Sequence, residues 1–329
     1  MILLEYESAI LRNLLERSLD ENEKLSGTYQ FCDFDGVEFQ IIFDRPKESK
    51  ESKEAKSKEP TTIIVKIKLP GAREIMENGG EEYYQRLYGE YIIDPKEGKG
   101  SEDKGNDKVY THAIKFVLQG LEEKKQKELI TLAARLRANL MAAPFIYVAE
   151  KYSKKESFAP FEIPYRPTTM ESIFITPSDN GAIATFAIHF SDPGDRIIGQ
   201  VFFQELKAAR TKIPSAPGIN FSFTVPKDLE AFTLPPAYKA GEDGQKEAAY
   251  GFVSLVLGQS QLSEPKRVQM AFNVPLFRNY LHYHIKCTKA FLHQRMRART
   301  SLLLRELDNA RPAPKKVIKR TAQGKIINH

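Results

Sequence analysis

Three histidines near the C-terminal end of the chain, His282, His284 and His293, are the residues whose type best suits a metal ion. A continuous helix is expected there, and on a helix side chains two residues apart point about 200° away from each other. His282 and His284 therefore cannot clasp one ion, and neither has a carboxylate or thiolate four residues further on. The chain also lacks the glycine-rich phosphate loops and the Gly-x-Ser-x-Gly elbow of serine hydrolases. We expect neither a metal nor a cofactor.

Two acids close together in sequence, Asp33 and Asp35, suggest phosphoryl chemistry instead. The string from Asp33 to Val37, DFDGV, resembles the first motif of haloacid-dehalogenase-type phosphatases, in which one acid attacks phosphorus and the second acts as acid or base. That nucleophile needs a buried parallel strand before it, whereas the residues from Gly27 to Gln30 alternate like a half-exposed strand. An Asp-Gly hairpin turn is the favoured interpretation, and the phosphatase is the weakest alternative.

The most informative segment is the predicted closing helix, at about residues 275–309. It contains no glycine, Asn273 is a candidate cap, and Pro275 suits the first helical position. Basic side chains recur on one face of this helix, at Arg278, His282, Lys286, Lys289, His293 and Arg297. No acid interrupts this basic ladder, so the like charges repel at i,i+4 spacing unless an anionic surface compensates. The ladder predicts a binding face, with a solvated helix face as the alternative.

A broad apolar arc on the same helix is wide enough to pack on a parent sheet and still offer a seam to another helix. The candidate subunit-interface residues within this arc are Phe277, Leu281, Ile285, Phe291 and Leu292. Aromatic residues such as Tyr280 and Tyr283 also accompany the basic ones, which raises the alternative of a nucleic-acid-binding module. These rings fall with the apolar arc, and none lines up with the basic ladder as a base-stacking platform would need.

Two similar sets of elements must position these residues. In the first half, a hairpin around Asp33 to Gly36 is followed by strands at 61–69, 91–93 and 109–118. A long helix at 122–151 comes next, with Pro144 as a kink or stop. The second half predicts a helix at 197–209 and strands at 172–176, 182–190, 219–225 and 250–257.

This repeated plan predicts an α+β fold of two similar α/β sandwich-type domains, each an antiparallel sheet packed by helices, with a long C-terminal helix. The first domain is expected at residues 1–155, with a disordered insertion at 46–60 that is rich in Lys, Glu and Ser. The prolines from Pro160 to Pro167 mark the boundary, since each disfavours helix before it and breaks sheet pairing. The second domain is expected at residues 156–329 and ends in the basic helix and a basic tail.

Composition and charge narrow the class of protein. No stretch approaches the roughly 18 apolar residues of a membrane span, and MILLEYES lacks the basic and apolar regions of a secretory signal. Cys32 and Cys287 lie too far apart in sequence for a disulfide framework or a zinc clip, so a reduced cytosolic protein is expected. Residues 275–329 hold 13 Lys and Arg and two acids, a net charge of +11. The whole chain carries +6, so the difference leaves −5 for residues 1–274, and an anionic partner is expected at the C-terminal end.

The closing segment, FRNYLHYHIKCTKAFLHQRMRARTSLLLRELDNARP, resembles the closing helix of the subunit 2 family, the 34-kDa class, of the actin-related protein 2/3 complex. Other blocks agree along nearly the whole chain, namely MILLE, FCDFDGV, YQRLYGEYIIDP, IIGQVFFQELKAAR and APGINFSF. The departures are polar runs at 46–60, 96–108 and 238–247, and all of them fall in predicted loops.

The resemblance implies a scaffold subunit without catalytic activity. In the family the closing helix packs on its counterpart in subunit 4, and the pair holds the two actin-related subunits and touches the mother actin filament, from which a daughter filament is nucleated. The resemblance thus implies a cytoplasmic protein of the actin cytoskeleton and its cortical patches, with no nucleic acid as partner and no membrane insertion. We expect the apolar seam to carry subunit 4 and the basic ladder to face the filament.

Overall fold

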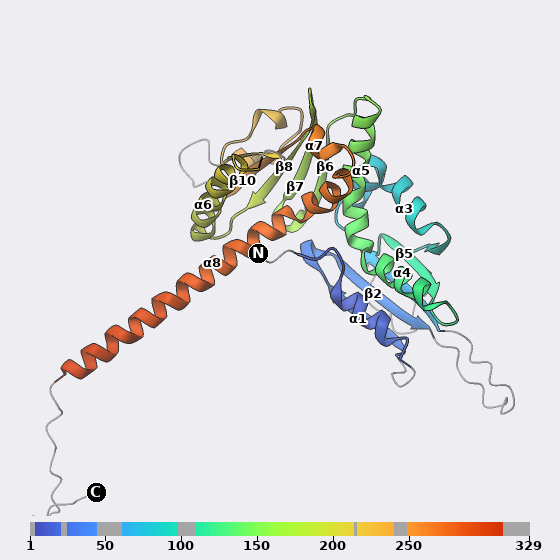
Figure 1. Ribbon diagram of the computed structural model, residues 1–329, viewed down its shortest axis with the longest axis horizontal. Coiled ribbons are helices and arrows are strands. Elements are labelled where there is room, and N and C mark those ends of the chain that lie inside the picture. Colours follow the sequence, from blue (N-terminus) through green and yellow to red (C-terminus); the bar gives the residue numbers. More distant parts are fainter. Residues whose placement is uncertain are drawn as a thin grey trace, which may run out of the picture. The chain divides into compact units, whose positions relative to one another are not determined.

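The computed structural model describes residues 4–20, 25–44, 61–97, 109–213, 216–239 and 249–311. Its strands form two antiparallel five-stranded sheets, ordered β1-β2-β3-β5-β4 and β6-β7-β8-β10-β9, and helices pack around both (Figure 1). This confirms the predicted α+β fold with two similar sheets and a long C-terminal helix. The predicted insertion at 46–60 and the tail beyond residue 311 lie outside the described residues, and the division into domains near residue 155 stays a prediction.

The first sheet is built from residues of the first half of the chain. Its strands are β1 (Gly27–Cys32), β2 (Glu38–Asp44), β3 (Thr62–Lys68), β4 (Ile92–Ile93) and β5 (His112–Val117). β1 pairs with β2 in antiparallel register from Gly27 opposite Phe43 to Cys32 opposite Glu38, which confirms the predicted hairpin. Asp35 and Gly36 both take positive φ angles in the connecting turn, as an Asp-Gly pair readily does. This antiparallel setting lacks the buried parallel strand that a phosphatase nucleophile needs.

Five helices accompany the first sheet within the described residues, namely α1 (Ala9–Arg17), α2 (Ala72–Ile75), α3 (Glu81–Tyr88), α4 (Glu123–Ala134) and α5 (Leu136–Ser153). The single helix predicted at 122–151 is wrong, because the chain leaves helical geometry at Arg135 and α4 and α5 meet at 69°. Pro144 lies inside α5 without ending it, since most α5 side chains are buried and their packing offsets the lost backbone hydrogen bond. No single described helix is long and apolar enough to span a membrane; α4 and α5 meet that test only as a bent pair.

The second sheet repeats the plan of the first. Its strands are β6 (Phe161–Arg166), β7 (Glu171–Ser178), β8 (Gly181–His189), β9 (Gly218–Ser222) and β10 (Tyr250–Leu257). Pro164 does not end sheet pairing as predicted, because β6 is an edge strand and its register with β7 shifts between Ile163 and Arg166. Phe174, Phe186 and Phe252 are fully buried in the core of this sheet.

The described residues of the second half form three α-helices, α6 (Pro193–Arg210), α7 (Gln259–Leu262) and α8 (Arg267–Ala310). α8 begins eight residues before the predicted start at Pro275, because the buried side chains between Met270 and Leu276 hold about two further turns of helix in place. Asn273 therefore does not cap α8, and its side chain accepts a hydrogen bond from the Tyr6 hydroxyl at 2.5 Å. The chain divides into compact units at residues 1–283 and 284–329, so we describe α8 as a root (267–283) and an arm (284–310).

Candidate functional site

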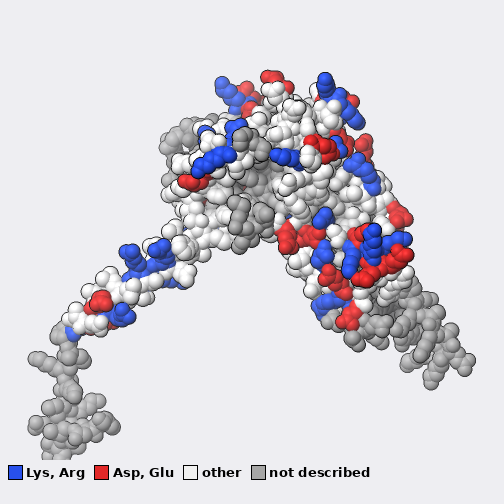
Figure 2. Space-filling view, viewed as in Figure 1, with Lys and Arg blue, Asp and Glu red and all other residues white. Residues whose placement is uncertain are grey.

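The residues of the predicted basic ladder differ in exposure along α8. Lys286, His293 and Arg297 are exposed, and His282 and Lys289 are half-buried. Arg278 is buried, at 8% exposure, so it does not belong to an exposed basic face as the sequence pattern predicted. Basic side chains gather along the visible face of the arm in Figure 2, and α8 contains no acid before Glu306.

The predicted apolar seam likewise divides into a buried part, which includes the first turn of the arm, and an exposed part further along the arm. Leu281 and Ile285 are fully buried, and the half-buried Phe277 lies against Phe186 of β8, with ring centroids 5.6 Å apart. Phe291 and Leu292, in contrast, are exposed at 56% and 47%. The arm exposes further large apolar side chains, at Met296, Leu302, Leu303, Leu304 and Leu307. Met296, Leu304 and Leu307 were missed from the sequence because they lie outside the apolar arc on the helical wheel.

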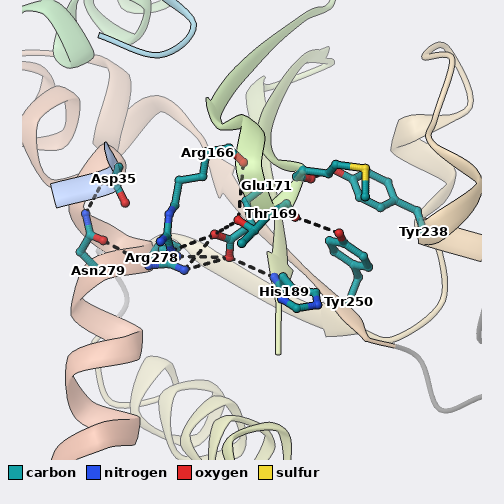
Figure 3. A network of polar contacts seen from close by, with 10 residues as sticks. Asp35, Arg166, Thr169, Glu171, His189, Tyr238, Tyr250, Arg278 and Asn279 are labelled. Carbon is teal, nitrogen blue, oxygen red and sulfur yellow. Dashed lines mark hydrogen bonds and ion pairs between the residues drawn. The ribbon is translucent and has the colours of Figure 1, made fainter. Parts of the chain in front are cut away.

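A buried carboxylate on β7, Glu171, explains why Arg278 is inside the protein (Figure 3). Arg278 Nη2 donates to Glu171 Oε2 at 2.8 Å and to Oε1 at 3.0 Å, and Nε donates to Oε1 at 3.2 Å. Arg166 Nη1 and Thr169 Oγ1 donate to Oε2 at 3.1 and 2.9 Å, and the backbone N–H of His189 donates to Oε1 at 3.0 Å. Both oxygens are thus saturated by donors, which is what a carboxylate without solvent requires.

The turn that connects Glu171 to β6 is held from the other side by two tyrosines. Tyr250 Oη donates to the carbonyl oxygen of Thr169 at 2.8 Å, and Tyr238 Oη donates to that of Met170 (Figure 3). Burial raises the pKa of both tyrosines, so the hydroxyls stay protonated and remain donors at neutral pH. The carboxylate therefore sits on a rigid turn that can fix a helix in one position.

The two acids of the DFDGV string are engaged within the chain rather than turned toward a substrate. Asp33 Oδ1 accepts from the backbone N–H of Phe34 at 2.8 Å, and its Oδ2 lies 3.3 Å from Arg137 Nε of α5. Asp35 Oδ2 accepts from Asn279 Nδ2 of α8 at 2.6 Å (Figure 3). Burial raises the pKa of Asp35, which the hydrogen bond from Asn279 and the charge of Arg278 oppose. The side chains of this motif therefore connect the first sheet to α5 and to α8.

The histidines and acids do not gather into a metal site in the described part of the chain, where no group of three or more suitable side chains occurs. The His282 ring stacks on Phe190, with centroids 6.1 Å apart and planes at 16°. Glu171 and Asn279 were missed from the sequence because their partners lie far away along the chain, 107 residues for Glu171 and Arg278 and 244 for Asn279 and Asp35. Arg166 lies only five residues from Glu171, but no local pattern marks that pair. The one local signal was Glu171 itself, a lone acid just before the apolar run Ile173 to Ile175.

Two comparisons with known proteins find relatives of this chain. A family model described as "Arp2/3 complex, 34 kD subunit p34-Arc" matches residues 65–314, a range that takes in the second sheet and all of α8. "Actin-related protein 2/3 complex subunit 2" of Dictyostelium discoideum is 30% identical over 329 residues, which cover 99% of each chain. The protein of the same name from Schizosaccharomyces pombe is 28% identical over 334 residues, which cover 95% of each chain. This chain belongs to the family of the 34 kD p34-Arc subunit of the Arp2/3 complex.

Proposed function

We propose that this chain is a non-catalytic scaffold subunit of the Arp2/3 complex. In this proposal it pairs with subunit 4, holds the two actin-related subunits in place, binds the mother actin filament and supports nucleation of a branch. The observation that carries the proposal is the α8 arm, which exposes a row of large apolar side chains beside basic ones on one helix. Membership of the family supports a place among the subunits of the Arp2/3 complex.

The apolar side of the arm supports a helical partner. Phe291, Leu292, Leu302 and Leu303 expose large apolar side chains within the apolar arc, and burying such surface stabilises a complex by about 25 cal/mol per Å². Contiguous apolar patches on soluble proteins mark interaction sites. An amphipathic helix of subunit 4 that lies along the arm would cover these side chains by ordinary helix–helix packing.

The basic side of the arm supports an anionic partner. Lys286, Lys289, His293 and Arg297 follow one another at helical spacing, and no acid of α8 precedes Glu306. Like charges at this spacing disfavour the isolated helix, and a negatively charged surface such as that of an actin filament removes the repulsion. The proposed site of action is the cytoplasmic actin cytoskeleton, including its cortical patches.

A scaffold accelerates nucleation without any chemical step of its own. Actin monomers that meet in solution lose translational and rotational freedom on association, and a prearranged template removes much of this cost. The buried network around Glu171 suits this role, since it provides the rigid attachment that a template requires.

A pull-down through the tagged full-length chain tests the proposal. The unchanged chain should retain subunit 4 and the two actin-related subunits. The Phe291→Asp/Leu292→Asp variant should lose subunit 4, because two charges then stand in the apolar seam. Both side chains are exposed, so the fold of the chain itself should survive the change.

The matched control places the same charges on another exposed apolar pair, in Ile197→Asp/Val201→Asp on α6. This control should retain subunit 4. Equal retention by both variants would refute the assignment of the seam, and an unchanged chain that retains none of the subunits would refute the scaffold function.

A further inference from the structure

Two adjacent residues of the α8 root attach the helix to different sheets. Arg278 bonds Glu171, the first residue of β7 in the second sheet. Asn279 bonds Asp35, which lies in the turn between β1 and β2 of the first sheet. The four side chains meet in one cluster, and all of them belong to the same compact unit (Figure 3).

The contact between Asn279 and Asp35 is directional. The Asn279 side chain is buried, its Oδ1 lies 3.5 Å from Arg278 Nη1, and its Nδ2 lies 2.6 Å from Asp35 Oδ2. A carbonyl oxygen thus faces a guanidinium and an amide N–H faces a carboxylate, which fixes the orientation of the amide. An acid at position 279 would set an acceptor against an acceptor.

Asp35 depends strongly on this one donor. Its other oxygen, Oδ1, is buried and makes no hydrogen bond within the described part of the chain. The backbone at Asp35 has a φ of 62°, so the turn holds this residue in a left-handed backbone conformation that few residues other than Asn, Asp and Gly adopt. Loss of the amide would leave the carboxylate buried without a hydrogen bond from α8.

We propose that Arg278 and Asn279 are positioning residues for partner binding, because together they fix the root of α8 to both sheets at once. This inference rests on the proposed function, in which the arm of the same continuous helix carries the seam and the ladder. Arg278 supplies the strong, charged attachment to the second sheet, and Asn279 supplies the weaker, directional attachment to the first. Filament branching then depends on contacts made within this chain.

The test exchanges the two side chains across the contact. Asn279→Asp places a second carboxylate against that of Asp35. It should reduce branch formation by the purified complex several-fold, while the amount of assembled complex changes little. The double variant Asp35→Asn/Asn279→Asp restores a pair of amide and carboxylate, in which position 35 now donates the hydrogen bond and position 279 accepts it. It should recover most of the branches. Branches are counted by fluorescence microscopy on preformed filaments at equal concentrations of complex.

A matched control makes the same chemical change on the same helix. Asn273→Asp keeps an acceptor for the Tyr6 hydroxyl and should branch like the unchanged chain. Full branching by Asn279→Asp, or no recovery in the double variant, would overturn the inference. If Asn279→Asp prevents assembly, recovery of assembly in the double variant becomes the deciding readout. Absence of branches with the unchanged chain would instead count against the proposed function.

Discussion

At the scale of single residues, the buried carboxylate of Glu171 and the half-buried carboxylate of Asp35, both beside α8, are compensated to different degrees. Both oxygens of Glu171 accept several hydrogen bonds, two of its donors being arginines. Asp35 accepts one, from Asn279. Burial raises the pKa of Asp35, and Asn279, Arg278 and Arg137 offset this only in part. The folded protein therefore favours the protonated form of Asp35 more than the unfolded chain does.

This imbalance predicts the effect of Asp35→Asn on stability. Above its raised pKa, Asp35 is ionised and lowers the free energy of unfolding, because the charge loses hydration when the chain folds. Asn carries no charge and avoids this cost. Asn also tolerates the positive φ angle and keeps an oxygen for Asn279. The variant should melt at a higher temperature than the unchanged chain at pH 7.

The advantage should shrink as the pH falls through the raised pKa of the acid, and disappear below the pKa of an unfolded aspartate, about 3.9. Calorimetry of the full-length chain and of its Asp35→Asn variant from pH 3 to 8 measures the difference in melting temperature at pH 7 and its decrease toward low pH. A lower melting temperature at pH 7 would show that the arginines make the ionised acid stabilising, contrary to this account.

At the scale of elements, close packing of a short turn on α5 is the most sensitive feature of the first half. A π-helical turn, Met76–Gly80, lies against α5, and Gly79 has a φ of +88°. A Cβ at Gly79 would lie 2.4 Å from the Cβ of Tyr147, which is the base of that side chain and not its flexible end. Only glycine fits both the backbone and the contact.

Gly79→Ala should therefore lower the free energy of unfolding by more than the cost of placing alanine in a left-handed backbone conformation, because the added Cβ also collides with Tyr147. Gly120 is the matched control, with a φ of +84° and no atom within 4 Å of an added Cβ. Gly120→Ala should reduce the free energy of unfolding by about 1–2 kcal/mol. Gly79→Ala should cost about 1–3 kcal/mol more from overpacking. Equal losses in urea unfolding would mean that Tyr147 moves aside freely.

The elements also show what sequence patterns can and cannot predict. Hydrophobic alternation located the hairpin and the other strands of both sheets except β6 to within a few residues, because side-chain period follows local burial. β6 was missed, since its prolines were interpreted as a boundary between domains. The break at Arg135 and the start of α8 at Arg267 were missed, since tertiary packing overrides the local signals of Pro144 and Pro275. The Glu171–Arg278 and Asp35–Asn279 contacts join residues that are far apart in the sequence and meet only in the folded chain. No pattern among neighbouring residues could predict them.

At the scale of the whole molecule, charge is concentrated at one end of the chain. Residues 275–329 carry +11, and residues 1–274 carry −5. Most of the described part of this basic segment is the arm of α8, and Figure 2 shows patches of Lys and Arg side chains along the arm, with acidic side chains near its end. Because these charges are exposed, an attraction to filaments through them should weaken as salt rises above physiological ionic strength, where the Debye length is about 8 Å.

Filament binding by the purified complex tests the central claim most directly. Lys286→Glu/Lys289→Glu reverses two charges of the ladder, and Lys124→Glu/Lys125→Glu on α4 makes the same change at exposed positions elsewhere. Co-sedimentation with preformed actin filaments, repeated with duplex DNA at matched salt, compares the two variants with the unchanged complex.

The account predicts that the α8 variant assembles normally, binds filaments at least several-fold more weakly and forms correspondingly fewer branches. The α4 variant should behave like the unchanged complex. Undiminished filament binding by Lys286→Glu/Lys289→Glu, or tighter binding of the unchanged complex to DNA than to filaments, would contradict the claim that the basic face of α8 binds actin.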